Sequence, residues 1–237
     1  MGINTEYRTQ EPEIMDDFSL QGEELREALD QIARINQLLG GNKVILQGLK
    51  RLLKQTDTTK TITIADIGCG NGDMLRMLAR YGQKNKLSFK LIGIDANDYT
   101  INYAKKLSTA YSNIEYNCVD IFSEDFKAIH YDIILCTLTL HHFTDEQILK
   151  IISIFSNNAK TGIIINDLHR SKTAYRLFEL ICVVFNLNSM SREDGLISIL
   201  RGFRKKELEE FSNKLNLKNY TISWKWAFRY QWIIAKQ

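Results

Sequence analysis

The sequence predicts an α/β fold in which helices cover both faces of a mostly parallel sheet. Between residues 61 and 166, short runs rich in β-branched residues alternate with amphipathic stretches of helical period. Strands that alternate with helices are joined by right-handed crossovers, which place the strands in parallel. The chain has 237 residues, of which 44% are hydrophobic and 25% charged, and this suits one large domain with a small elaboration.

The chain begins with a helical region, expected over residues 11–55. Its apolar side chains recur at three- and four-residue steps, at Leu25, Leu29, Ile32, Ile35 and Leu38. Gly40 and Gly41 predict the end of the first helix, and the polar residues 56–60 predict a boundary. We therefore expect an N-terminal helical cap or lid over residues 1–58 and a main domain over residues 59–237.

The main domain opens with the alternating elements. Strands are expected at 61–67, 89–94, 114–119, 132–137 and 162–166. Helices are expected at 74–81, 101–109 and 144–155, and Thr144 with Gln147 forms a capping box for the last of them.

The C-terminal part of the domain has a different pattern. Helices are expected at 172–186 and 205–215, and the first belongs to a helical insertion over about 172–200. Two strands, at 220–226 and 229–235, then form an antiparallel hairpin at the edge of the sheet.

A glycine-rich loop, Asp66-Ile67-Gly68-Cys69-Gly70-Asn71-Gly72, follows the first strand and opens a helix. Its glycines let the backbone turn tightly and approach a ligand closely. A dinucleotide site would have glycine at position 73, where this chain has Asp73, whose charge opposes a pyrophosphate.

Two further acidic residues end strands at a regular spacing. Asp95 ends the second strand, 25 residues beyond Gly70, and Asp120 ends the third strand after another 25 residues. Asp95 can accept hydrogen bonds from both hydroxyls of a ribose, and Asp120 from the amino group of an adenine. Either residue alone could be a helix cap or a loop charge, but the three strand ends together predict a crevice for an adenosine without phosphates.

These motifs, with Leu138-Thr139-Leu140-His141-His142-Phe143, resemble those of the class I S-adenosylmethionine-dependent methyltransferases. The resemblance covers residues 61–237 and implies a Rossmann-like, seven-stranded, mostly parallel sheet with an antiparallel last strand. More narrowly, the chain resembles small-molecule enzymes of the ubiquinone/menaquinone type and enzymes of polyketide or phenolic-lipid pathways. That likeness rests on Glu13-Ile14-Met15-Asp16-Asp17, on residues 34–41, on Asp167-Leu168-His169-Arg170 and on Arg201-Gly202-Phe203-Arg204.

The resemblance implies S-adenosyl-L-methionine as the cofactor and assigns its contacts. Gly68 and Gly70 would face the methionine part, Asp95 the ribose, and Thr137 the amino group through its carbonyl. Asp120 and Ile121 would hold the adenine. The full set of expected cofactor-binding residues is Asp66, Gly68, Cys69, Gly70, Asp95, Ala96, Asp120, Ile121 and Thr137.

The acceptor side is predicted from residues that follow the fourth and fifth strands. His141 or His142 could deprotonate a hydroxyl beside the reacting methyl group, or could cap the next helix or pack beneath the cofactor. His169 and Arg170 could line the acceptor pocket, or Arg170 could form a surface salt bridge. Apolar residues of the two helical pieces, among them Met15, Tyr175 and Phe178, are expected to form a lid or to pack on the sheet.

Composition limits the partners and the compartment. The net charge of +3 is too small for a strong nucleic-acid footprint, and no transmembrane segment or secretory signal is recognised. The four cysteines lack metal-ligand spacing, so reduced thiols in a cytoplasmic protein are expected. Asn166, Asp167 and His169 with His141 match no ligand pattern, and no metal is expected. A homodimer is left open.

The sequence thus predicts methyl transfer from S-adenosylmethionine to an oxygen or carbon of a small, aromatic or apolar molecule of secondary metabolism. One alternative is an RNA or protein methyltransferase, which the low net charge and the residues Cys136-Thr137-Leu138-Thr139 after the fourth strand disfavour. Another is a non-catalytic cofactor-binding subunit, which the intact cofactor motifs disfavour.

Overall fold

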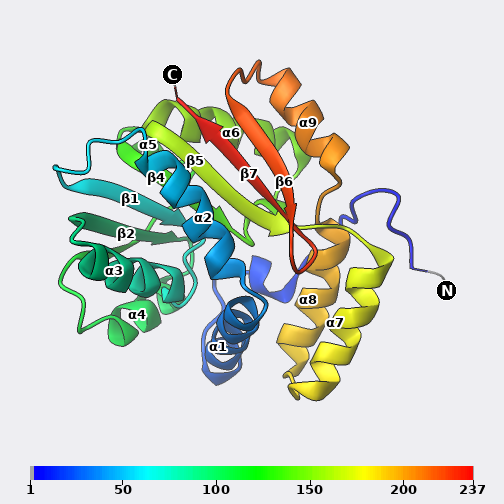
Figure 1. The fold of residues 1–237 in the computed structure, drawn as a ribbon. Helices are drawn as coiled ribbons and strands as arrows, with labels where there is room; N and C mark the ends of the chain where they lie inside the picture. The colour runs from blue at the N-terminus through cyan, green and yellow to red at the C-terminus, as the bar shows by residue number, and fades with distance from the viewer. Residues whose placement is uncertain (1–2, 237) are drawn as a thin grey trace.

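The computed structural model describes residues 3–236 and is built around one seven-stranded sheet (Figure 1). The strands lie in the order β3-β2-β1-β4-β5-β7-β6. Strands β1 to β5 are parallel, and β7 is antiparallel to both β5 and β6. Their bounds are β1 (Ile62–Ile67), β2 (Phe89–Asp95), β3 (Ile114–Cys118), β4 (Tyr131–Thr137), β5 (Ala159–Leu168), β6 (Tyr220–Lys225) and β7 (Arg229–Ala235). The mostly parallel sheet with an antiparallel last strand is therefore confirmed.

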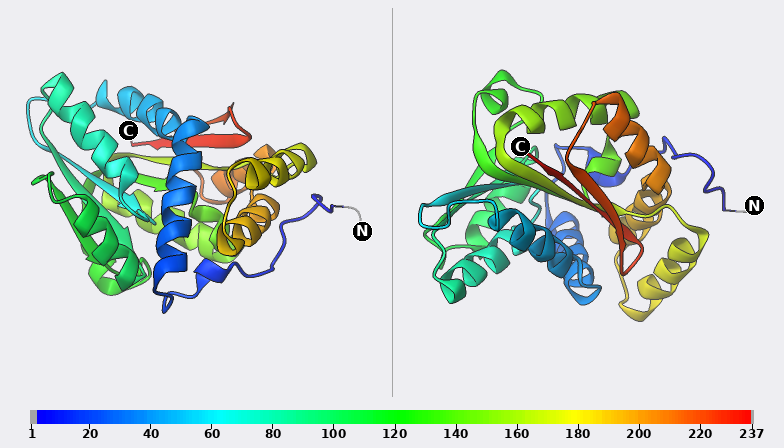
Figure 2. Two further views of the ribbon diagram at one scale, coloured as in Figure 1. Left: turned by 90° about the horizontal axis from the view of Figure 1, so that it is seen from below. Right: turned by 45° about the horizontal axis from the view of Figure 1, so that its top comes forward.

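Two layers of helices cover the sheet (Figure 2). On one face pack α2 (Gly41–Leu53), α3 (Asp73–Asn85) and α4 (Asp98–Leu107), through a core that includes Ile45, Leu75 and Ile101. On the other face pack α5 (Glu124–Lys127), α6 (Asp145–Asn158) and α9 (Lys205–Lys214), through a core that includes Phe126, Phe155 and Phe211. Because side chains alternate along a strand, the apolar residues of β1 divide between the two cores, with Ile62 and Ile64 on one side and Ala65 and Ile67 on the other.

The remaining helices gather where the parallel strands end (Figure 1). They are the short η1 (Ile14–Asp16), α1 (Glu23–Leu38), η2 (Leu140–His142), α7 (Lys172–Val184) and α8 (Ser189–Arg201). Contacts join α8 to α1, to α7 and to both short helices. Open α/β proteins bind ligands at the carboxyl edge of the sheet. Here that edge is covered by helices from the N-terminal region and from residues 172–201.

Helix α8 lies within the predicted helical insertion over about 172–200, but the sequence does not predict it as a separate helix. Its buried residues include Ser191, Asp194, Ser198 and Arg201, so that polar side chains stand where a helix of regular amphipathic pattern has apolar ones. Residues 186–195 are mostly polar, and residues 189–195 form the first turns of this helix.

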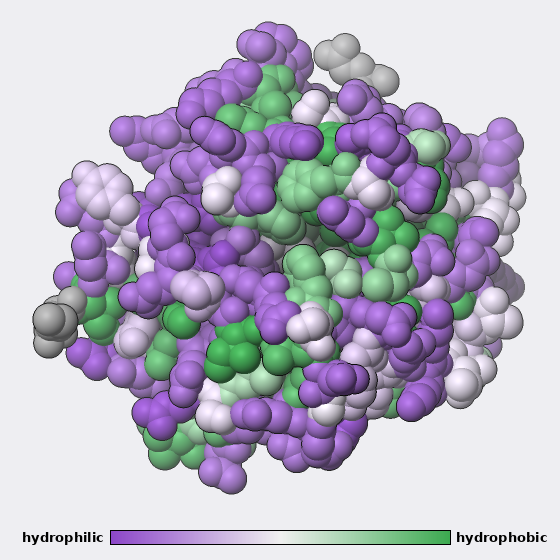
Figure 3. Space-filling view, turned by 180° about the vertical axis from the view of Figure 1, so that it is seen from behind, coloured by the Kyte–Doolittle hydropathy of each residue, from purple (hydrophilic) through white to green (hydrophobic). Residues whose placement is uncertain are grey.

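The surface has the mixed polar and apolar character expected from the composition. From behind it is largely hydrophilic, with apolar residues gathered near its middle (Figure 3). None of the helices within residues 3–236 combines the length and the hydropathy that a bilayer crossing requires. All four cysteines are free thiols.

The N-terminal segment is held against the domain by Arg170, whose side chain is completely buried. Its guanidinium donates to the backbone carbonyls of Thr5, Glu6 and Gly202, at 3.0, 3.2 and 2.5 Å, and forms an ion pair with Glu207 at 2.5 Å. Arg170 therefore clamps the start of the chain to α9.

We expect Arg170→Ala to lower the free energy of unfolding by about 3–5 kcal/mol, because the change leaves several buried acceptors unpaired. Arg176 is the matched control, since it pairs with Glu179 at 2.8 Å on the exposed face of α7. Arg176→Ala should cost about 0–1 kcal/mol, as exposed ion pairs do. Urea denaturation followed by circular dichroism would measure both, and equal midpoints for the two variants would contradict the clamp.

Candidate active site

One large cavity, of about 990 Å³, opens at the carboxyl edge of the sheet. All nine residues expected to bind the cofactor line it, as do both histidines expected to be catalytic. The expected acceptor residues divide. Met15 and Phe178 line the cavity, whereas His169, Arg170 and Tyr175 are not among its lining residues.

The glycine-rich loop forms the floor at the sheet end of this cavity. Gly68 and Gly70 adopt φ of +66° and +51°, in the left-handed region that favours glycine. A Cβ atom on Gly68 would lie 2.2 Å from Oγ1 of Thr139, whereas one on Gly70 would meet only Leu29, at 3.7 Å. The loop therefore packs against Thr139 on one side and leaves open space above Gly70 for a ligand.

Three carboxylates surround that space. Asp95 accepts hydrogen bonds from the backbone N–H groups of Gly70, at 3.2 Å, and Asn97, at 3.1 Å. Asp120 accepts from the backbone of Phe122 at 2.8 Å. Asp66 is buried, and its Oδ1 has no hydrogen-bond partner. Burial, and then repulsion from Asp73 and Asp95, raise the pKa of Asp66 well above its usual value.

An unpartnered buried carboxylate oxygen beside an open glycine is a place for a positively charged or hydrogen-bond-donating group. S-Adenosylmethionine carries an ammonium group, a sulfonium and two ribose hydroxyls, all of which suit acidic partners. The residues present therefore fit this cofactor.

Another part of the cavity wall is built around His141, which is 2% exposed. Its Nδ1 lies 2.6 Å from Oδ1 of Asp167, at the end of β5. The same carboxylate accepts from the backbone N–H groups of Leu140 and His141 at 2.9 and 3.3 Å. Although burial opposes ionisation, attraction to His141, the hydrogen bond with its ring and the hydrogen bond from the backbone of Leu168 hold the pKa of Asp167 below its usual value. Asp167 thus fixes the tautomer with the proton on Nδ1, which leaves Nε2 as an acceptor.

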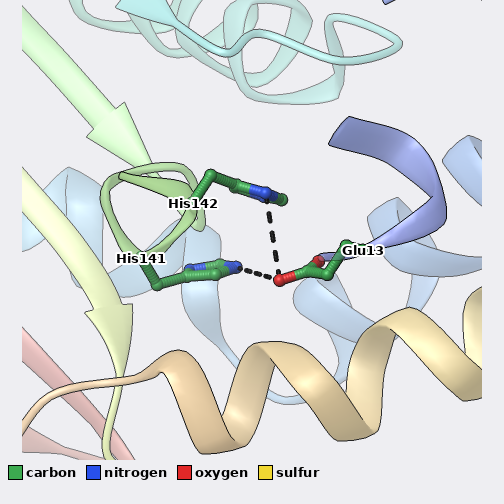
Figure 4. Close-up of side chains that lie close together, drawn as sticks. All are labelled: Glu13, His141 and His142. Atoms are coloured by element: carbon green, nitrogen blue, oxygen red, sulfur yellow. Dashed lines mark ion pairs between the residues drawn. The ribbon is translucent and has the colours of Figure 1, made fainter. Parts of the chain in front are cut away.

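His141 Nε2 faces the carboxylate of Glu13, which comes from the N-terminal segment (Figure 4). The distance from Nε2 to Glu13 Oε1 is 3.6 Å, and Nε2 has no hydrogen-bond partner. The ring of His142 stacks on that of His141, with centroids 4.4 Å apart, and its Nδ1 lies 2.7 Å from Oδ1 of Asp16.

Helix α8 holds the N-terminal segment in this position. Asp194 accepts from the backbone N–H groups of Ile14 and Met15 at 2.6 and 2.9 Å. Ser198 donates to Glu13 at 2.7 Å, and Arg201 donates to Asp16 at 2.6 Å. The polar residues Asp194, Ser198 and Arg201, which interrupt the apolar pattern expected of a buried helix face, are therefore the ones that hold η1 over the cavity.

Glu13, His141 and His142 offer ligand atoms that all lie within 4.8 Å of one another, a donor set that a divalent transition metal accepts. Their neighbours oppose a metal. Arg201 Nη1 lies 3.4 Å from the same Glu13 oxygen, and Asp16 already occupies Nδ1 of His142. A cationic guanidinium repels a second cation, so this cluster suits proton transfer better than metal binding.

The sequence does not predict Glu13, Asp16, Asp194 and Arg201 as parts of the site. Glu13, Asp16 and Arg201 stand in motifs that carry the narrower family resemblance, but nothing in the sequence assigns them a role, and Asp194 stands in no motif. His169 lies away from the cavity, where its Nδ1 accepts from Trp224 Nε1 at 3.2 Å and its ring stacks on Phe228.

Comparisons with known proteins agree with the fold and with the cofactor crevice. Residues 64–162 match the family described as a methyltransferase domain. The ubiquinone biosynthesis O-methyltransferase of Coxiella burnetii is 32% identical over 98 residues, which are 41% of this chain and 39% of that protein. The chain thus aligns with about two fifths of the length of this curated relative.

Two solved structures share the fold over nearly the whole chain. The plantazolicin methyltransferase, in complex with SAH, superposes with a TM-score of 0.63 at 19% identity, covering 90% of this chain and 96% of its own. The magnesium protoporphyrin IX methyltransferase of Synechocystis PCC 6803, with bound SAM, gives a TM-score of 0.56 at 14% identity, covering 86% and 84%. The matched domain over residues 64–162 and the curated relative, with the crevice, support a class I S-adenosylmethionine-dependent methyltransferase, and the two solved structures share its fold.

Proposed function

We propose that the protein transfers the methyl group of S-adenosylmethionine to a hydroxyl of a small molecule whose body is apolar or aromatic. The observation that carries the proposal is a continuous cavity that joins the cofactor crevice to a buried Asp167–His141 pair. A histidine held by a carboxylate, with a free Nε2, is the arrangement of a general base.

The cofactor would lie between the glycine-rich loop and the ends of β1, β2 and β3. Asp66 and Gly70 would hold its amino acid part, Asp95 its ribose, and Asp120 with Ile121 its adenine. Bound there, it supplies a methyl group on a positively charged sulfur, which becomes neutral when the methyl group leaves. The chain's own contribution is to align the acceptor and to exclude water.

The part of the cavity around His141, which we call the acceptor end, favours one polar group on an apolar molecule. Its polar groups cluster at Glu13, Asp16, His141 and His142, and the surrounding wall is apolar. That wall includes Met15, Phe18, Leu20, Phe178, Leu180 and Ile181. A hydroxyl at His141 with an apolar body against this wall would satisfy both regions. A carbon acceptor activated through an enol hydroxyl fits the same arrangement.

The cap over residues 1–58 and the helical insertion over about 172–200 would then form the lid of the acceptor pocket. Support comes from η1, α7 and α8, which each contribute residues to the cavity wall. Such a lid would exclude water while the reaction proceeds.

Radiolabelled S-adenosylmethionine with a panel of phenol, catechol and 4-alkylphenols, against total RNA, tests the function. Methylation of panel members but not of RNA is expected. Methylation of RNA alone would favour the nucleic-acid alternative, and no methylation of any compound would favour a non-catalytic subunit.

Asp95→Ala should weaken the binding of S-adenosylhomocysteine by about 1–3 kcal/mol, because charge-assisted hydrogen bonds to the ribose are lost. Asp98→Ala is the control, since Asp98 is an exposed residue in the first turn of α4. Calorimetric titration would measure both affinities. Unchanged affinity in Asp95→Ala would remove the ribose assignment.

His141→Ala should lower kcat about 10²–10⁴-fold with little change in the affinity for S-adenosylhomocysteine, because a general base acts in the transition state. His130→Ala, at an exposed position between α5 and β4, is the control. If His142→Ala is inactive while His141→Ala is fully active, the two roles must be exchanged. If both variants are active, the acceptor reacts without a base.

A further inference from the structure

Glu13 presents a buried carboxyl group to Nε2 of His141, although it lies far from the matched methyltransferase domain in the sequence. The residue is 5% exposed and lines the cavity. Its contact with His141 therefore places a group from the N-terminal segment directly at the acceptor end.

The gap between the two groups is suited to one oxygen atom. At 3.6 Å, His141 Nε2 and Glu13 Oε1 are too far apart for a direct hydrogen bond. An oxygen about 2.8 Å from each of them would complete a triangle with ordinary hydrogen-bond lengths. An acceptor hydroxyl seated there would donate to Nε2 and would receive a hydrogen bond from Glu13, provided that Glu13 carries a proton.

The surroundings of Glu13 favour that proton. Burial, the largest effect, raises the pKa of Glu13 to about 7, against the opposing attraction of His142, the hydrogen bond from Ser198 and the attraction of Arg201. The charged and titratable groups that face it are His141 and His142 from η2, Asp16 from η1, and Asp194 and Arg201 from α8.

We propose that Glu13, in its protonated form, is a catalytic residue that donates a hydrogen bond to the acceptor oxygen while His141 removes the proton of that hydroxyl. The inference rests on the proposed function. The hydroxyl proton passes to Nε2, and the electron pair left on oxygen forms the bond to the methyl carbon as the carbon–sulfur pair leaves on sulfur. Glu13 keeps its proton and stabilises the negative charge that develops on oxygen before the bond forms.

Three variants separate a proton-donating Glu13 from an ionised one. Glu13→Gln keeps an N–H donor of similar shape that cannot ionise, Glu13→Ala removes the donor, and Glu11→Gln changes an exposed acid two residues earlier. Turnover is measured on the phenol of the panel that the wild type methylates fastest. We expect Glu13→Ala to lose about 10²–10³-fold in kcat, as enzymes that lose an oxyanion donor do. Glu13→Gln should stay within about tenfold of the wild type.

The pH profile adds a second signature. Wild-type turnover should fall as Glu13 ionises above pH about 7, whereas Glu13→Gln should keep its turnover to higher pH. A Glu13→Gln variant as inactive as Glu13→Ala would show that the carboxylate itself is needed, and full activity in Glu13→Ala would show no contact with the acceptor. Either result overturns the inference, whereas a wild type that methylates no panel compound overturns the proposed function first.

A stability measurement tests the protonation state without any acceptor. Because the pKa of Glu13 in the folded protein exceeds its usual 4.5, the folded state binds more protons between those two values. The urea midpoint of the wild type should therefore fall more steeply from pH 5 to pH 8 than that of Glu13→Gln. Identical pH dependence in both proteins would show that Glu13 is ionised when folded, and the inference would be wrong even if methyl transfer stands.

Discussion

The buried carboxylate of Asp167 is the constraint on which the proposed acceptor end depends. It lies at the end of β5, yet three of the groups bonded to it belong to η2, which follows β4. A buried carboxylate requires several donors, and besides the backbone of Leu168 they are the backbone of Leu140 and both the backbone and the ring of His141. One charge therefore joins two neighbouring strand ends and sets the orientation of the imidazole, and the placement of His142 and of η1 follows from it.

How much of the fold and of the site can be predicted from the sequence depends on how far apart in the sequence the interacting residues lie. The strands and the cofactor crevice follow from local patterns. Runs of β-branched residues predict the strands, and the loop from Asp66 to Gly72 and the acids Asp95 and Asp120 lie at or just after strand ends. Their convergence needs only the rule that parallel strands share a carboxyl edge. The cluster of Glu13, His141, Asp167 and Arg201 depends on tertiary contacts between segments far apart in sequence, and no spacing rule connects them.

Helix α8 shows the same limit in a second form. A pattern of apolar residues predicts a helix when its buried face is apolar, but the buried face of α8 carries Asp194, Ser198 and Arg201 because its partner is a polar segment.

Residues 169 and 170 show that the direction of a side chain is not predictable from its position after a strand. They follow β5 as closely as the site residues do, yet His169 turns to Trp224 and Arg170 to the start of the chain. Position after a strand predicts nearness to the edge, and only packing decides which way each side chain points.

The clamped N-terminal segment has a consequence for the order in which the molecule forms on the ribosome. Glu13 is synthesised well before its partners His141, Ser198 and Arg201, which follow it by 128, 185 and 188 residues. At synthesis rates of about 5–20 residues per second, the segment waits roughly 10–40 s for α8 to emerge. The crevice between β1 and β2 can form during that time, so the nascent chain acquires a place for the cofactor before it acquires a place for the acceptor.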